Sequence, residues 1–148
     1  MRKTLILLTA FILFACKSET RDKGSEDYSA RPSEKKVQSP EIKQSIDRGA
    51  RIYNNFCATC HLASGEGIAN AFPPLNNSDW LKEKRKESIA AVKNGLNGPI
   101  EVNGEEYNSV MTDLGLTDEE VADVMNYIFT AWDNNIEPPV TVEEVARY

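Results

Sequence analysis

One run of five residues combines side chains that can attach and ligate a metal-containing cofactor. It reads Cys57-Ala58-Thr59-Cys60-His61, two thiols three positions apart followed at once by an imidazole. A Cys-x-x-Cys-His run is typical of covalent attachment of a c-type haem, in which both sulfurs form thioethers with the porphyrin. The adjacent imidazole then becomes the proximal ligand of the iron. The sequence therefore predicts one covalent haem c, held by Cys57 and Cys60.

Other interpretations of this run are weakened by what the chain lacks. His61 is its single histidine, and the third cysteine, Cys16, lies far upstream. A structural zinc site needs four ligands, usually from two paired clusters of Cys or His. No further Cys or His follows His61, so the chain cannot supply the second cluster. A thioredoxin-type pair is expected beside a βαβ pattern, which the sequence does not show. The remaining alternative is a chance occurrence of the motif at the end of a buried helix.

An iron with one imidazole either has a second axial ligand or stays open to small molecules, and without a second histidine the candidates for that ligand are methionines. The candidates are Met1, Met111 and Met125. Met1 belongs to a targeting segment, and Met125 lies on the apolar stripe of a predicted helix, where a core role is expected. Met111 follows His61 by 50 positions in a non-helical stretch that can fold over the opposite haem face. We therefore predict His61 and Met111 as axial ligands. Such a pair raises the reduction potential of the haem relative to two strong nitrogen ligands.

The N-terminus has the composition of an export signal. It begins with Arg2 and Lys3 and continues through residues 5–15, which are apolar apart from Thr9. This stretch is shorter than the roughly 20 residues of a membrane-spanning helix. A basic start, a short apolar region and a small residue at the boundary are typical of a signal peptide. We predict that residues 1–15 form this signal.

The boundary of the signal points to lipidation. Leu13-Phe14-Ala15-Cys16 resembles the end of a bacterial lipoprotein signal, in which the cysteine becomes the lipidated first residue of the mature protein. More than one acyl chain gives stable membrane anchoring. The alternative is an ordinary secretory signal that leaves Cys16 as a spare thiol.

Composition divides the rest of the chain into a tether and a domain. Residues 16–44 are rich in Ser, Lys, Glu and Asp and nearly lack apolar side chains, which predicts a disordered tether. Residues 45–148 have the size of one domain. From Ile46 onward 8 Lys/Arg and 17 Asp/Glu give a net charge of −9. Such an acidic domain argues against a nucleic-acid partner, which would require a basic face.

Apolar periodicity and turn signals place the elements of the domain. A helix over 46–56 leads into the pentapeptide, with Gly49 where another helix crosses closely. The last helix starts at Thr117, because Glu120 three residues later completes a capping box. The other expected features are a loop at 62–80, a helix at 82–94 ended by Gly95, a hairpin turned at Asn103-Gly104, and a short turn or helix at 141–148.

With these features, residues 45–148 resemble the class I cytochrome c family. The resemblance is closest to small single-haem domains that serve periplasmic enzymes such as copper nitrite reductases. It implies the all-α cytochrome c fold, with helices and loops wrapped around one covalent haem, to which the sequence adds a short β-hairpin. The matching features are Gly49 and Tyr53, the haem pentapeptide, Gly65-Glu66-Gly67, Phe72-Pro73-Pro74-Leu75, Tyr107-Asn108-Ser109-Val110-Met111 and the aromatic last helix.

The resemblance also implies roles for single residues. Cys57 and Cys60 would carry the thioethers, His61 would be proximal and Met111 distal. A backbone carbonyl of Pro73 or Pro74 would accept a hydrogen bond from the second nitrogen of His61, unless the proline pair is simply a stiff turn. The further residues implied in the haem pocket or at the propionates are Leu75, Trp80, Tyr107 and Asn108.

One position departs from the family pattern. Thr112 follows the distal methionine where relatives commonly have proline. Without the fixed φ of proline, the ligand loop is expected to be looser and the iron–sulfur bond weaker.

The expected function is membrane-tethered transfer of one electron at a time between a respiratory donor and an oxidase or reductase. No nucleophile–base pair is recognisable, so the chain is not expected to be an enzyme. The expected location is the periplasmic or other extracytoplasmic face, and the expected partners are redox proteins and the membrane. Alternatives are a haem sensor or peroxidase-like protein with a displaceable Met111, and an accessory cytochrome subunit of a larger enzyme.

Acidic side chains on the predicted last helix offer one possible contact for a basic redox partner. The alternative is an ordinary solvated helix face whose charges complement the helix dipole. These side chains are Asp118, Glu119, Glu120 and Asp123.

Overall fold

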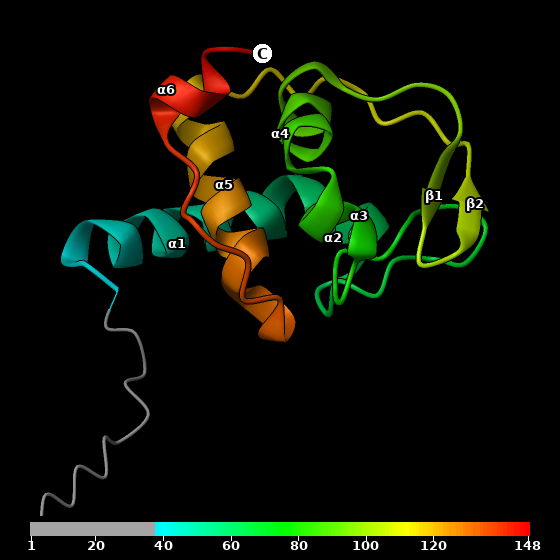
Figure 1. Ribbon diagram of the computed structural model, residues 1–148, viewed down its shortest axis with the longest axis horizontal. Coiled ribbons are helices and arrows are strands. Elements are labelled where there is room, and N and C mark those ends of the chain that lie inside the picture. Colours follow the sequence, from blue (N-terminus) through cyan, green and yellow to red (C-terminus); the bar gives the residue numbers. More distant parts are fainter. Residues whose placement is uncertain (1–37) are drawn as a thin grey trace, which may run out of the picture. The chain divides into compact units, whose positions relative to one another are not determined.

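The computed structural model describes residues 38–148, a mainly helical fold with one two-stranded sheet (Figure 1). The all-α class with a small hairpin is therefore confirmed. The predicted signal at 1–15, Cys16 and the tether as far as residue 37 lie outside the described residues. Among the described residues, no helix has the length and apolar character needed to cross a bilayer.

The first helix, α1 (Pro40–Ile52), begins six residues earlier than predicted. The Ser39 side chain accepts a hydrogen bond from the Ile42 amide, and Pro40 occupies the first helical turn, where its fixed φ suits the helix. Ser45 is buried and accepts a hydrogen bond of 2.9 Å from the Asn126 amide group. The assignment of residues 40–44 to a disordered tether was therefore wrong.

Between α1 and the haem motif the backbone widens into a π-helical turn, Tyr53–Cys57, before α2 (Ala58–His61). A π turn contains one more residue per hydrogen-bonded loop than an α turn, so it rotates the residues that follow about the helix axis. Tyr53 is fully buried, and its hydroxyl donates to the Leu62 carbonyl at 2.7 Å. This bond fixes the chain where it leaves α2.

Helix α1 crosses the last long helix, α5 (Asp118–Thr130), at Gly49 (Figure 1). A Cβ atom at Gly49 would lie 1.9 Å from the Asp123 carbonyl oxygen, so only glycine allows this approach. The prediction of a close crossing at Gly49 is confirmed. Beside the crossing, Arg48 donates two hydrogen bonds to the Asp123 carboxylate. The capping box of Thr117 and Glu120 at the start of α5 is also present, as predicted.

The predicted helix at 82–94 is two helices, α3 (Asp79–Glu83) and α4 (Arg85–Asn94). They are separated at Lys84, whose φ of −116° and ψ of 48° are not helical. The Ser78 side chain caps α3, a start signal that the sequence interpretation overlooked. Gly95 ends α4 with φ of +79°, as predicted.

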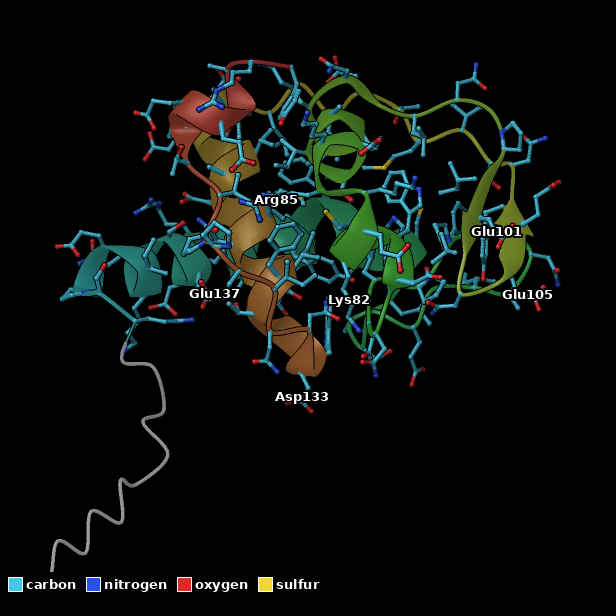
Figure 2. All side chains as sticks on the ribbon, viewed as in Figure 1. Lys82, Arg85, Glu101, Glu105, Asp133 and Glu137 are labelled. Carbon is cyan, nitrogen blue, oxygen red and sulfur yellow. The ribbon has the colours of Figure 1, made fainter. Side chains whose placement is uncertain are left out.

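The short helix α6 (Val142–Val145) is fastened to α4 and α5 by one arginine. Arg85 donates two hydrogen bonds of 2.8 Å to the Glu144 carboxylate. Its guanidinium also lies 5.1 Å from the centre of the Phe129 ring, and Figure 2 shows Arg85 between α4 and α5. The terminal helix predicted within 141–148 is thereby confirmed and tied to the core.

The hairpin is formed by β1 (Ile100–Val102) and β2 (Glu105–Tyr107), joined by the predicted Asn103-Gly104 turn. Asp79 and Asn103 exchange two hydrogen bonds, each from a backbone amide to the other's side chain, at 3.0 and 2.8 Å. These bonds attach the turn of the hairpin to the start of α3. The core lies between α1, α4 and α5 and includes the fully buried side chains Tyr53, Ile89, Val121, Met125 and Phe129.

Candidate functional site

Two adjoining hollows form one chamber beside α2. The outer hollow has a volume of about 730 Å³ and the inner one about 570 Å³, both with open solvent included. Six residues line both hollows, which makes them continuous: Cys57, His61, Pro73, Leu96, Ile100 and Met111. Most other lining side chains are apolar. A chamber of this size, with few polar groups among apolar walls, is typical of a cofactor site.

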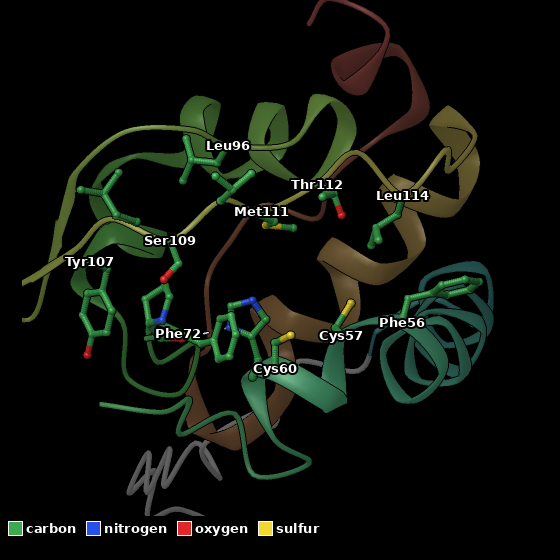
Figure 3. A pocket seen from close by; sticks show the side chains of 14 residues that line it. Phe56, Cys57, Cys60, Phe72, Leu96, Tyr107, Ser109, Met111, Thr112 and Leu114 are labelled. Atoms are coloured by element: carbon green, nitrogen blue, oxygen red, sulfur yellow. Dashed lines mark hydrogen bonds between the residues drawn. The ribbon is translucent and has the colours of Figure 1, made fainter. Parts of the chain in front are cut away.

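The two cysteines lie on one side of the chamber, at the end of the π turn and in α2. Cys57 and Cys60 are free thiols that both line the outer hollow, because residues three apart share a helical face. Figure 3 shows both side chains directed into the same pocket. Burial raises the pKa of the Cys57 thiol to about 11, with a smaller contribution from Cys60. The unmodified thiol is therefore neutral at pH 7.

His61 is held by a hydrogen bond between its Nδ1 atom and the Pro73 carbonyl oxygen, 3.0 Å apart. A carbonyl can only accept, so Nδ1 carries the proton and the lone pair of Nε2 is left for a metal. Burial lowers the pKa of His61, and the bond to Pro73 opposes that shift. The ring is therefore a neutral imidazole in the tautomer that ligates iron. The sequence left Pro73 and Pro74 open, and the structure selects Pro73.

Met111 lies across the chamber from the two cysteines (Figure 3). Its backbone forms an isolated antiparallel bridge with Leu96, with a 2.8 Å bond from Leu96 N to Met111 O and a 2.9 Å bond from Met111 N to Leu96 O. Gly95 permits this approach, since a Cβ atom there would lie 2.6 Å from the Met111 carbonyl oxygen. Met125 also lines the inner hollow, but it lies within α5 and is a fully buried member of the core. The core position predicted for Met125 is confirmed.

The other predicted pocket residues are distributed unevenly. Pro74, Leu75 and Trp80 line the inner hollow, and Tyr107 lines the outer one. Asn108, the first residue after β2, is exposed and lines neither hollow. It therefore does not line the chamber, and its contact with a haem propionate stays a prediction.

Several lining residues were missed by sequence reasoning. Four are apolar residues of loops and a strand end, where no periodic pattern marks an inward side: Phe72, Leu96, Ile100 and Leu114. The fifth, Phe56, lies in the π turn, which changes the side of the helix that it faces. The one signal available for Leu96 is its position directly after Gly95, the glycine that ends α4. The pairing of Leu96 with Met111 is a tertiary contact that this signal does not reveal.

The chemistry of these groups fits a haem c. Two thiols lie on one wall beside an imidazole whose tautomer leaves Nε2 free, and a thioether sulfur lies on the opposite wall. These are the groups that thioether attachment and His/Met ligation of haem iron require. The apolar lining suits a porphyrin ring and would keep water from the iron.

Comparison with known proteins agrees with this geometry. The sequence model of the family Cytochrome c matches residues 46–132. Cytochrome c-552 of Thermus thermophilus is 43% identical over 108 residues, which cover 67% of this chain and 82% of the relative. The cytochrome c subunit of the quinone alcohol dehydrogenase of Gluconobacter oxydans is 29% identical over 108 residues, covering 67% of this chain and 21% of that subunit.

A third relative is also named as a subunit of an enzyme. The Cbb3-type cytochrome c oxidase subunit FixP of Sinorhizobium medicae is 30% identical over 98 residues, covering 64% of this chain and 33% of that subunit. The family match extends over more than half of the chain and includes the whole Cys-x-x-Cys-His run. Together with the chamber, its thiols and the Pro73-bonded imidazole, these similarities show that the chain belongs to the cytochrome c family of electron carriers, which carry a covalently attached haem c.

Proposed function

We propose that this protein is a membrane-tethered carrier of single electrons on the extracytoplasmic face, with no enzymatic activity of its own. Cys57 and Cys60 would form the thioethers, and His61 and Met111 would be the axial ligands of the iron. The observation that carries the proposal is that these four side chains line one chamber from opposite walls.

Both proposed ligands are fixed by the chain itself. The Pro73 carbonyl holds the ring of His61 at 3.0 Å, and the two bonds to Leu96 hold the backbone of Met111. The bond to Pro73 sets the orientation and the basicity of the imidazole, and the bonds to Leu96 fix the position of the Met111 backbone. When bound, the haem supplies a reversible one-electron iron couple. Ligands that are already in position need little rearrangement when the charge of the iron changes.

The membrane part of the proposal depends on the N-terminal sequence. Lipid at Cys16 would anchor the chain, and residues 17–39, the part before α1, would act as a spacer. Such a spacer would keep the domain close to the membrane surface, where respiratory donors and acceptors lie.

The two alternative functions are favoured unequally. A sensor or peroxidase-like role needs Met111 to leave the iron easily, and the paired bonds to Leu96 oppose movement of its backbone. An accessory-subunit role is favoured by two relatives, one named as the cytochrome c subunit of a quinone alcohol dehydrogenase and one as a subunit of a Cbb3-type cytochrome c oxidase. That role keeps the same electron-transfer chemistry and adds a stable partner enzyme.

Potentiometric titration of the haem-loaded protein in isolated membranes tests the proposal. We expect one reversible one-electron wave, with about 59 mV per tenfold change in the oxidised-to-reduced ratio, and no change when carbon monoxide is added. Cys16→Ser should move the haem protein to the soluble fraction without altering the wave. Rapid carbon monoxide binding by the wild type would contradict the carrier. Membrane retention of Cys16→Ser would contradict the lipid anchor.

A further inference from the structure

The outer hollow opens between apolar side chains that are exposed to solvent. Val110 is 62% exposed and Phe56 is 50% exposed, and both line the hollow. Ser109 and Thr112, which also line it, are exposed as well. Exposed apolar groups that surround the mouth of a cavity are typical of an interaction surface. We call this set of four residues the mouth.

Charge is segregated around the mouth. All residues that line the outer hollow come from segments 56–73 and 96–114. These two segments contain no Lys or Arg, and their acidic residues are Glu66, Glu101, Glu105, Glu106 and Asp113. The nine Lys and Arg residues of the described part lie elsewhere, at 43–51, 82–93 and 147. The two segments that form the mouth therefore carry only acidic charges.

The hairpin carries three of these acidic residues, and two of them lie opposite each other in a pairing that destabilises the hairpin. Glu101 and Glu106 are directly opposite each other across the two strands, and both are exposed. The neighbouring pair, Ile100 and Tyr107, faces the outer hollow, so the glutamates face away from it. Like charges directly opposite on a sheet are destabilising. Within residues 38–148, neither glutamate forms an ion pair.

The acidic residues of α5 differ from those of the hairpin. Asp118 pairs with Lys93 at 2.9 Å, and Arg48 pairs with both Glu119 and Asp123. The remaining candidate, Glu120, closes the capping box of the helix. The α5 carboxylates are thus engaged within the chain, whereas those of the hairpin are free to meet a partner. Figure 2 shows Glu101 and Glu105 on the hairpin, away from Lys82 and Arg85.

We propose that the mouth and the outer side of the hairpin together dock a redox protein whose contact surface has an apolar centre ringed by Lys and Arg. Val110 and Phe56 would meet the apolar centre, and Glu101 and Glu106 would meet the basic ring. Complementary charge of this kind increases association rates and orients the partners. This inference rests on the proposed electron-carrier function and names the class of partner.

Voltammetry on self-assembled monolayers tests the docking surface without the natural partner. The haem-loaded protein is adsorbed on gold that carries a mixed amine- and methyl-terminated monolayer, a surrogate for a basic surface with apolar centres. A carboxylate- and methyl-terminated monolayer of equal thickness serves as the comparison. We expect interfacial electron transfer about tenfold faster on the amine surface, because the mouth then faces the electrode.

Matched variants separate orientation from net charge. Glu101→Gln with Glu106→Gln removes two charges from the hairpin, and Asp47→Asn with Glu87→Gln removes two exposed charges from α1 and α4. On the amine surface, interfacial electron transfer should be at least about threefold slower in the hairpin variant than in the wild type. The control variant should keep the wild-type rate. Val110→Asn should also slow transfer there.

Failure of the docking inference and failure of the electron-carrier function would give different results. Equal rates on both monolayers, or equal losses in the hairpin and control variants, would show that the hairpin does not orient the protein. In that case the electron-carrier function would still stand if dissolved mediators reduce the haem reversibly. Absence of a reversible one-electron wave with any electrode or mediator would instead contradict the proposed function itself.

Discussion

Met111 and Leu96 hold each other through two backbone hydrogen bonds of 2.8 and 2.9 Å, in an isolated bridge between two loops. The bridge fixes the backbone of the proposed distal ligand although the next residue is Thr112 and not proline. The looseness expected at Thr112 is thus opposed by a contact that was not apparent in the sequence. The residue that permits the contact is Gly95, which packs against the carbonyl group of Met111.

Gly95→Ala should loosen the distal ligand. The new Cβ atom would lie 2.6 Å from the Met111 carbonyl oxygen. Such overpacking typically costs about 1–3 kcal/mol of stability, because the neighbouring backbone has to shift. We expect the affinity of the ferric haem for added imidazole to rise about tenfold, which corresponds to about 1.4 kcal/mol. Gly98→Ala is the control, because φ is also positive there and nothing lies within 4 Å. Equal effects in both variants would show that backbone strain, not the bridge, is responsible.

Tyr53→Phe should weaken the exit from the haem-attachment helix. The variant removes the 2.7 Å bond to the carbonyl of Leu62, a residue held at a positive φ of 62° directly after His61. We expect the free energy of unfolding of the haem-loaded protein to fall by about 1–2 kcal/mol in guanidinium titrations. Tyr127 contacts the Tyr53 ring but forms no hydroxyl hydrogen bond within residues 38–148. Tyr127→Phe should therefore have little effect, and a loss as large as that of Tyr53→Phe would argue against the proposed role of the bond.

Gly49→Ala should disrupt the crossing of α1 and α5. The added methyl group would lie 1.9 Å from the Asp123 carbonyl oxygen, so the helices must move apart. We expect the free energy of unfolding to fall by about 2 kcal/mol or more, even though alanine is a better helix former than glycine. Gln44→Ala at an exposed position of the same helix provides the comparison. Unchanged thermal stability of Gly49→Ala would contradict the crossing.

Glu144→Gln should remove a pH-dependent part of the stability. The hydrogen bonds from Arg85 hold the pKa of Glu144 below its usual value of 4.5. A lowered folded-state pKa contributes stability that is present above the unfolded pKa and is lost as pH falls through the folded one. We therefore expect a loss of about 1–2 kcal/mol at pH 7 that shrinks below about pH 4.5. Unfolding curves across this range check it, with Glu87→Gln on α4 as the control. A constant difference at all pH values would refute the assignment.

The sequence predicted those parts of the fold that depend on local signals. The capping box at Thr117, the Asn103-Gly104 turn and the end of α4 at Gly95 each follow from residues within one turn of the element. The start of α1 was missed because Pro40 was read as part of a tether, although proline also suits a first helical turn. The break at Lys84 was missed because an amphipathic pattern continues across it.

The candidate site was predictable where chemistry restricts the residue type. The haem pentapeptide, the scarcity of histidine and the position of Met111 identified the residues that the structure gathers around one chamber. The contacts that position them were not predictable, because they join residues distant in sequence through backbone groups that every residue has. The bridge from Leu96 to Met111 is the clearest example. The choice of Pro73 over Pro74 likewise depends on the path of the loop.

The visible absorption spectrum of the ferric protein tests the central claim most directly, namely that His61 and Met111 bind the iron of a covalent haem. A sulfur ligand to ferric haem gives a weak charge-transfer band at the red end of the spectrum. We expect this band in the wild type, its loss in Met111→Ala, and its retention in Met125→Leu, which alters the buried methionine of α5. A wild-type spectrum without the band, or a band that survives Met111→Ala, would contradict the assignment.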